Sequence, residues 1–218
     1  MQRFGRRLQR SFFDRDVDEV ARDLLGRVIA VDHAGLRVAV RLTEVEAYAG
    51  LEDPASHAFR GRTPRSSIMF GPAGHLYTYF VYGMHWCANI VAGPVGDASA
   101  VLLRAGEVVD GVDTARLRRS RVTRDTELAR GPAGLATVLA FDASSNGTDL
   151  CRPDGEVALF TGEPPLASAV RIGPRVGVAA AAEIERRFWI EAEPSVSAFR
   201  AWTPRKRTAG PAAALRKR

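Results

Sequence analysis

Apolar residues near the start of the chain recur at the spacing of a helix. Four of them would lie on one side of a helix over residues 17–25. They are Val17, Val20, Ala21 and Leu24. Asp14 or Asp16 stands before this segment as a candidate N-cap, and Gly26 follows it as a candidate stop. The pattern therefore predicts one short amphipathic helix here.

The next segments alternate between apolar and polar residues, which is typical of strands. Residues 27–31 and 36–48 predict two antiparallel strands, joined by a turn at residues 33–35. Alternate residues of a strand point to one face, and one face of the second strand begins apolar and ends acidic. Its members are Val38, Val40, Leu42, Glu44, Glu46 and Tyr48. This pattern favours a carboxylate held at the rim of the core, although an exposed strand edge would look the same.

A long connection and a second hairpin follow. Residues 49–74 are rich in Gly, Pro, Ser and Arg, and long structured loops inside a domain often carry function. Residues 76–91 predict two strands that turn near Gly83, which places Tyr82 and Met84 at the tip. Large apolar side chains at a tip suit a wedge between stacked bases. A buried hairpin whose aromatic residues all belong to the core is the alternative.

The second half of the chain predicts shorter elements. A helix is expected at residues 110–120, followed by arginines, and another begins at Gly131-Pro132. Strands are expected at residues 98–104, 157–161, 167–172 and 187–190, and an alanine-rich helical turn at 179–184. We expect a single domain over residues 1–202 and a basic, disordered tail over residues 203–218.

Composition favours a polyanionic partner. The 218 residues carry a formal net charge of +6, which fits nucleic acid better than an acidic surface or a neutral metabolite. Cys87 and Cys151 stand far apart in the sequence, as expected for free thiols in a reducing compartment. The sequence contains no apolar run long enough for a bilayer and no signal-like start. We therefore expect a cytoplasmic protein that makes no membrane contact.

The distribution of lysine excludes two mechanisms. Lys206 and Lys217 are the only lysines, and both stand in the C-terminal tail. Arginine stays protonated and does not form a Schiff base. Schiff-base catalysis by a core residue and a Walker-type phosphate loop are therefore excluded.

A metal hydrolase is the weaker alternative. His85 and Cys87 lie two residues apart on one predicted strand, and His75 precedes them. These are zinc-ligand types, but no fourth ligand stands at a supporting spacing. We therefore expect neither a metal nor a cofactor.

Ordered motifs along the chain resemble those of one enzyme family. They are EVEAY at residues 44–48, EDPASH at 52–57, RTPR at 62–65, YFVYGM at 79–84, LLRA at 102–105, GP at 131–132 and PRVGV at 174–178. Over roughly residues 11–200 the chain resembles the alkyladenine (3-methyladenine) DNA glycosylases. The resemblance implies removal of alkylated or deaminated purines from damaged double-stranded DNA in base-excision repair. It also implies an α/β fold of the α+β type, a single compact domain with a curved antiparallel sheet core, short surrounding helices and a protruding DNA-inserting β-hairpin.

The resemblance also assigns roles to individual residues. Glu46 matches the general base, and Arg104 matches the arginine that helps to hold the attacking water, together with the backbone at Val176. The residues that match the walls around the flipped base are Tyr48, His57 and Tyr79. Asn89 matches an asparagine that discriminates against the exocyclic amine of guanine.

Other positions are expected to contact DNA. Tyr82 matches the side chain that fills the vacated base stack, and Met84 stands beside it at the hairpin tip. Thr63 and Arg65 in the long connection, and Arg119 in the basic stretch, are further candidates for contacts to the phosphate backbone. Gly134 stands where some family members carry lysine.

These residues fit a mechanism with one carboxylate. Flipping a base out of the duplex costs a few kcal/mol, and stacking it on an aromatic side chain contributes roughly 1–3 kcal/mol. A cationic alkylpurine gains a cation–π contact and is already a good leaving group, so a Glu-activated water suffices. Without a core lysine, we expect a monofunctional glycosylase that leaves an abasic site.

We further expect a monomer without an obligate protein partner, held on the nucleoid through DNA. A DNA- or RNA-binding module with an aromatic hairpin and no catalytic activity is the alternative. That alternative leaves the acidic strand end beside Arg104 unexplained.

Overall fold

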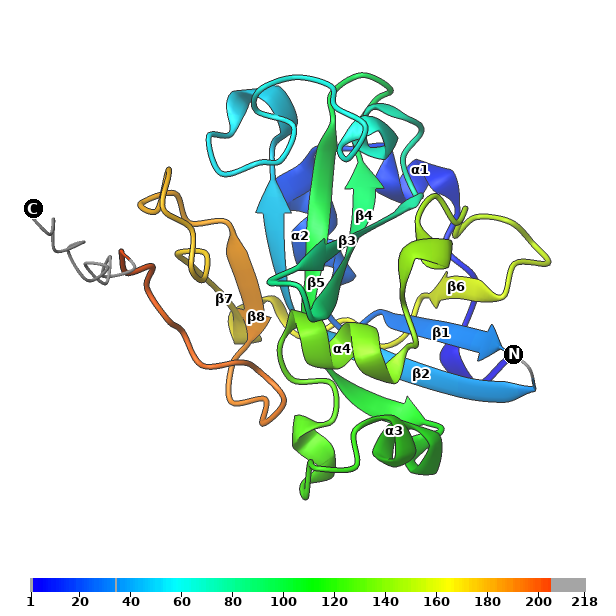
Figure 1. The fold of residues 1–218 in the computed structure, drawn as a ribbon. Helices are drawn as coiled ribbons and strands as arrows, with labels where there is room; N and C mark the ends of the chain where they lie inside the picture. Colours follow the sequence, from blue (N-terminus) through cyan, green and yellow to red (C-terminus); the bar gives the residue numbers. More distant parts are fainter. Residues whose placement is uncertain (1, 34, 205–218) are drawn as a thin grey trace, which may run out of the picture.

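An eight-stranded antiparallel sheet forms the centre of the protein in a computed structural model that describes residues 2–33 and 35–204 (Figure 1). The strands follow the order β3-β4-β5-β2-β1-β6, and β8 pairs with both β2 and β7. Their bounds are β1 Val28–His33, β2 Leu36–Tyr48, β3 Leu76–Val81, β4 His85–Ala92, β5 Ser99–Asp110, β6 Val157–Phe160, β7 Val170–Gly173 and β8 Arg187–Ile190. The predicted tail lies outside the described residues from residue 205 onward.

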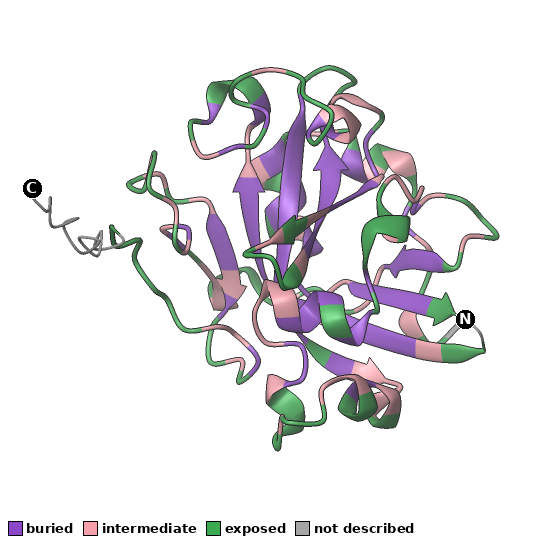
Figure 2. Cartoon of the chain, viewed as in Figure 1, coloured by how far each residue is buried: buried purple, intermediate pink, exposed green. Residues whose placement is uncertain are grey.

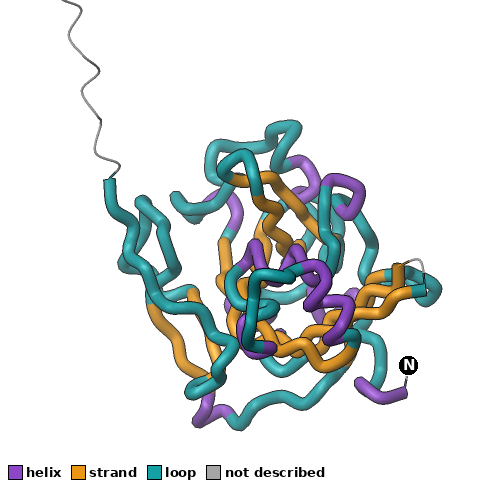
Figure 3. The backbone as a smooth tube through the Cα atoms, turned by 60° about the horizontal axis from the view of Figure 1, so that its bottom comes forward, coloured by secondary structure: helices purple, strands orange, loops and turns teal. Residues whose placement is uncertain are grey.

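Short helices and loops surround the strands, which run through the middle of the molecule (Figure 3). The α-helices are α1 Arg10–Phe13, α2 Val17–Leu24, α3 Val112–Arg118 and α4 Pro132–Val138. Single 3₁₀ turns are found at Gln2–Phe4, Gly50–Glu52, Ser67–Phe70, Asp125–Glu127, Ala143–Ser145 and Ala167–Ala169. The predicted α+β class, with a curved antiparallel sheet core in one compact domain, is confirmed.

The first predicted helix is also confirmed. Its four apolar residues are buried, and α2 packs against β2 and β5. Asp16 is the N-cap, because its side chain accepts the backbone N–H groups of Asp18 and Glu19 at 2.9 and 3.2 Å. Gly26 follows the helix with a φ of +77°, as expected for a glycine stop.

Strand β2 connects the two parts of the sheet. Its first half pairs with β1 through residues 36–41, its second half pairs with β8 through residues 44–46, and β5 runs beside residues 39–48. Both faces of its second half are buried, as the colouring in Figure 2 shows for the central strands. The acidic end of β2 is therefore not an exposed strand edge.

The alternation of β2 breaks at an irregularity that the sequence pattern did not indicate. The pairing with β5 shifts twice between Leu42 and Val45, so that each strand carries one extra residue there. The β2 residues in the main apolar core are Val38, Val40 and Leu42 before the shift, and Val45 and Ala47 after it. Bulges of this kind re-aim side chains. The prediction of one continuous face is therefore wrong, because the shift turns Glu46 and its acidic neighbour away from the core.

Two smaller predictions are corrected. Residues 179–184 form bends and a turn instead of a helical turn. Ala181 has a φ of +50°, and a segment this short gains too few hydrogen bonds to offset helix nucleation. The strand expected at residues 167–172 begins with a 3₁₀ turn, and β7 starts only at Val170.

Gly26 offers a test of how tightly the end of α2 is packed. A Cβ at this position would lie 2.1 Å from the Glu163 carbonyl oxygen, whereas Gly35, at nearly the same φ, has no atom within 4 Å of such a Cβ. Gly35→Ala therefore measures the backbone strain alone, about 1 kcal/mol, and Gly26→Ala adds overlap of about 1–3 kcal/mol. Urea unfolding at equilibrium measures both. Equal losses in the free energy of unfolding would show that the backbone at Glu163 can move away and make room for the added methyl group.

Candidate active site

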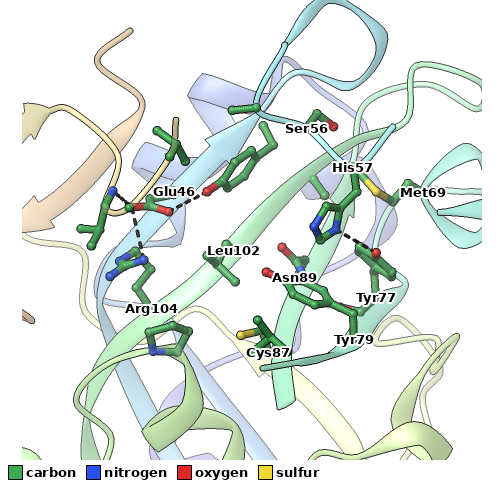
Figure 4. Close-up of a pocket in the computed structure, with 18 of the residues that line it drawn as sticks. Glu46, Ser56, His57, Met69, Tyr77, Tyr79, Cys87, Asn89, Leu102 and Arg104 are labelled. Atoms are coloured by element: carbon green, nitrogen blue, oxygen red, sulfur yellow. Dashed lines mark hydrogen bonds and ion pairs between the residues drawn. The ribbon is translucent and has the colours of Figure 1, made fainter. Parts of the chain in front are cut away.

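A cavity of about 510 Å³ lies beside the end of β2 and is lined by β2, β3, β4, β5, the start of α4 and the loops after β2 and β7. The predicted site residues that line it are Glu46, Tyr48, His57, Arg65, Tyr79, Tyr82, Asn89, Arg104 and Val176. Figure 4 shows Glu46 and Arg104 on one side, and His57, Tyr77 and Tyr79 on the other, with Leu102 and Asn89 between them. The fold therefore brings residues from distant parts of the sequence around one space.

Three donors fix the carboxylate of Glu46. Its Oε1 accepts the Val176 N–H at 2.7 Å and lies 3.3 Å from Nη1 of Arg104. Its Oε2 accepts the hydroxyl of Tyr48 at 2.9 Å. The side chain is buried among these groups while it lines the cavity. Oε2 has one donor and keeps a further lone pair, so the group can still accept a hydrogen bond from water.

Glu44 lies behind Glu46 and joins β2 to β5, β8 and the C-terminal segment. Its Oε1 accepts Nε of Arg104 and Nε of Arg187, each at 2.8 Å. Ser197 donates its backbone N–H to Oε2 at 2.7 Å and its hydroxyl to Oε1 at 2.9 Å. Burial raises the pKa of Glu44, but the two arginines and Ser197 outweigh burial and hold the pKa below its ordinary value. Glu44 therefore remains ionised and anchors Arg104.

Arg104 bridges the two carboxylates. Burial lowers its pKa, but the charges of Glu46 and Glu44 outweigh burial and raise it. Its guanidinium stays protonated, and its planar shape lets Nε face Glu44 while Nη1 faces Glu46.

Aromatic side chains form the opposite wall. The rings of His57 and Tyr79 meet edge to face, with centroids 4.6 Å apart. Nδ1 of His57 lies 3.0 Å from the hydroxyl of Tyr77, and the guanidinium of Arg65 lies 5.0 Å over the Tyr79 ring. Burial, helped by the charge of Arg65, lowers the pKa of His57 to about 4. The imidazole is therefore neutral near pH 7 and acts as an uncharged wall.

Asn89 is held at the floor of the cavity. Its Nδ2 donates to the Tyr77 carbonyl at 3.0 Å, and its side chain is buried. Tyr77 therefore supports both His57 and Asn89, although sequence reasoning did not single it out. Its position two residues before Tyr79 on β3 was the available signal, because both side chains then face the same side.

The β3–β4 hairpin presents its tip to solvent at the rim of the cavity. Tyr82 is 78% exposed and Met84 is 67% exposed. The Met84 N–H donates to the Val81 carbonyl at 3.2 Å, and both Tyr82 and Gly83 have positive φ. This is the geometry of a tight hairpin turn. The alternative of a fully buried hairpin is therefore wrong.

Three predicted DNA-contacting residues lie outside the cavity lining: Met84, Thr63 and Arg119. Thr63 exchanges hydrogen bonds with Ser66 and holds its loop in shape. Arg119 donates to the Leu128 carbonyl at 2.8 Å, and its Nη1 lies 2.0 Å from where a Cβ of Gly134 would be. The guanidinium of Arg119 therefore occupies the space that a side chain at Gly134 would need.

Asp53 and Arg175 form a second buried ion pair, which sequence reasoning did not single out. Nη2 of Arg175 donates to Oδ1 of Asp53 at 2.9 Å, Nη1 contacts Oδ2, and both side chains are fully buried. Nη1 also donates to the Ala47 carbonyl at 3.0 Å. The two residues are 122 positions apart, so no local pattern connects them.

Within residues 2–33 and 35–204, no group of three or more His, Cys, Asp or Glu side chains is placed to hold a metal ion. His75 contacts the Pro72 carbonyl and Arg10 instead of joining His85 and Cys87 in one group. In the same part of the chain, no helix has the length and apolar character needed to cross a membrane.

Comparisons with known proteins agree on one family. Residues 11–194 match the family model described as Methylpurine-DNA glycosylase. A protein of Streptomyces avermitilis is 52% identical over 202 residues, which cover 92% of this chain and 95% of that protein. A protein of Nocardia farcinica is 49% identical over 85% of this chain and 88% of its own length. Both relatives carry the name "Putative 3-methyladenine DNA glycosylase".

Glu44→Gln tests the buried charge cluster. At pH 7 we expect the free energy of unfolding to fall by about 3–5 kcal/mol, because Arg104 and Arg187 lose a shared counter-charge. The pKa of Glu44 lies below its ordinary value of 4.5, so its contribution is complete above pH 4.5 and disappears as the pH falls through the folded value. The difference between wild type and variant should therefore shrink in acid.

Glu107→Gln is the matched control. Glu107 lies on β5, the strand that also carries Arg104, and it is half-exposed. It pairs with Arg41 at 2.9 Å, and loss of this exposed pair should lower the free energy of unfolding by less than about 1 kcal/mol. Chemical denaturation at pH 7 and pH 4 measures both variants. A Glu44 variant no less stable than the Glu107 variant would contradict the anchoring role.

Proposed function

The chain belongs to the methylpurine-DNA glycosylase family, and we propose on that basis that it excises alkylated or deaminated purines from double-stranded DNA. The bond hydrolysed is the N-glycosidic bond between the damaged base and deoxyribose. Glu46 activates the attacking water, and the product is an abasic site.

The observation that carries this proposal is the fixed carboxylate of Glu46 at a cavity large enough to admit a purine nucleotide. A volume of about 510 Å³ lies within the usual range for small-molecule sites. Hydrogen bonds from Val176 and Tyr48 and the charge of Arg104 orient the carboxylate before substrate arrives. A preorganised base of this kind can take a proton from water as the bond to the base breaks.

The walls of the cavity suit a flipped purine. Tyr48, His57 and Tyr79 offer aromatic surface, and a base stacked on such a surface recovers much of the free energy lost on unstacking. The neutral imidazole of His57 does not repel a cationic alkylpurine. Asn89 faces the same space and is proposed to discriminate against the exocyclic amine of guanine.

The hairpin tip supplies the wedge. Tyr82 is exposed at the rim of the cavity, where it can fill the gap left by a flipped nucleotide. Met84 contacts the base pairs beside this gap, and Thr63, Arg65 and Arg119 contact the backbone of the duplex. One chain provides the cavity and the wedge, so the proposed reaction needs no second subunit.

The reaction ends at the abasic site. Residues 1–202 contain no lysine, so no lysine amine in this part of the chain can form a Schiff base with the opened sugar. We therefore propose a monofunctional glycosylase.

Glu46→Gln should keep binding to damaged duplex but lower single-turnover excision by at least about 10²-fold, because the amide does not accept the proton. Release of free base from methylated duplex DNA measures the rate, and Glu107→Gln serves as a control with the same change of charge. Near-wild-type excision by the Glu46 variant would rule out the general-base role. Failure of the wild-type protein to release any damaged base would overturn the proposed function itself.

Tyr82→Ala should weaken binding to damaged duplex by about tenfold, which corresponds to one lost stacking contact. Binding to undamaged duplex should change much less, because no base is flipped there. Leu117→Ala is the control, because it removes an exposed apolar side chain from α3, away from the hairpin. Fluorescence anisotropy measures both affinities, and equal losses on the two duplexes would argue against insertion.

A further inference from the structure

The buried pair of Asp53 and Arg175 lies next to the cavity but has no part in the proposed mechanism. Asp53 also accepts the backbone N–H groups of Ala49 and Ala55, at 3.1 and 3.0 Å. Burial raises the pKa of Asp53, but the contacts with Arg175 and these backbone groups outweigh burial and lower it. Both partners are therefore charged, and the pair as a whole is neutral.

Arg175 stacks on an aromatic wall of the cavity. Its guanidinium carbon lies 4.7 Å from the centroid of the Tyr48 ring. Tyr48 lines the cavity, whereas Arg175 is fully buried and does not line it. The ring of Tyr48 therefore separates the guanidinium from the space that a flipped base would occupy.

We propose that Asp53 compensates the charge of Arg175 behind Tyr48, and that this compensation sets the relative rates at which the enzyme excises cationic and neutral damaged bases. This inference rests on the proposed function. Neither residue touches the substrate, so both are positioning residues, and Asp53 determines specificity through Arg175 and the Tyr48 ring.

The physical reason is the sign of the charge behind the ring. An aromatic face attracts a cationic base through its quadrupole, and an uncompensated cation on the far face opposes that attraction. The negative charge of Asp53 cancels the positive charge of Arg175 and so removes this repulsion. Arg186 also lies near, with Nη1 3.7 Å from Oδ2 of Asp53, so loss of Asp53 would leave two guanidinium groups without this carboxylate.

A structural role for the pair would have a different signature. Arg175 also donates to the Ala47 carbonyl, and the next residue, Val176, donates to Glu46. A displaced loop would therefore slow excision of every base by the same factor. A ratio of rates for two bases of different charge cancels that factor and isolates the electrostatic effect.

The test uses two duplexes, one with cationic 7-methylguanine and one with neutral hypoxanthine, and compares their single-turnover rate constants. Asp53→Asn should lower the cationic-to-neutral ratio by about fivefold, the order expected for two charges about 10 Å apart in a partly screened site. Arg175→Gln removes the closer of the two guanidinium groups from the Asp53 carboxylate and should raise the ratio. Asp149→Asn, which breaks the Arg10–Asp149 pair outside the cavity, should leave the ratio unchanged.

The double variant Asp53→Asn with Arg175→Gln guards against misfolding of the single variants, because it buries no unpaired charge. Its ratio should lie within about twofold of wild type, because removing one charge of each sign leaves the net charge behind the ring as it is in the wild type. Shifts of the two single variants in the same direction, unchanged ratios, or a large shift in the double variant would each overturn the proposal. Wild-type protein that excises neither base would instead refute the proposed function.

Discussion

The site depends on one buried cluster of charges, in which Arg104 joins the carboxylates of Glu44 and Glu46. A buried ion is costly unless it has a partner of opposite charge and further hydrogen bonds. Arg187 and Ser197 meet this condition at Glu44, and Val176 and Tyr48 meet it at Glu46. The cluster therefore holds β5, β8 and the C-terminal segment around β2, and it fixes the carboxylate that faces the cavity.

The fold puts this cluster beside the cavity through a local defect in the sheet. The paired bulge between β2 and β5 changes which residues face the apolar core, so Glu46 and Arg104 face the cavity instead. A regular pair of strands would have kept the carboxylates on the side of Val38 and Val40. The bulge is thus the feature that separates the packed core from the chemical site.

Local signals in the sequence were sufficient for α2 and for the first hairpin. They placed Tyr82 at the turn of the second hairpin but left open whether that tip is buried, and the structure shows it exposed. They were not sufficient for the bulge, because the alternation of side chains along β2 shows no break at Thr43 in the sequence. Two contacts between distant segments also had no signal in the sequence. Arg187 meets Glu44 across 143 positions, and Arg175 meets Asp53 across 122. Only the folded chain reveals these two pairings.

The position of the sugar relative to Glu46 tests the proposed chemistry most directly. A crystal structure with a duplex that carries a cationic pyrrolidine in place of one deoxyribose would mimic the oxocarbenium-like transition state. We predict the pyrrolidine at the cavity, a water within about 3 Å of both Glu46 and the ring, and Tyr82 in the vacated stack. A pyrrolidine that stays within the helix, or a Glu46 carboxylate without a water facing the ring, would contradict the mechanism.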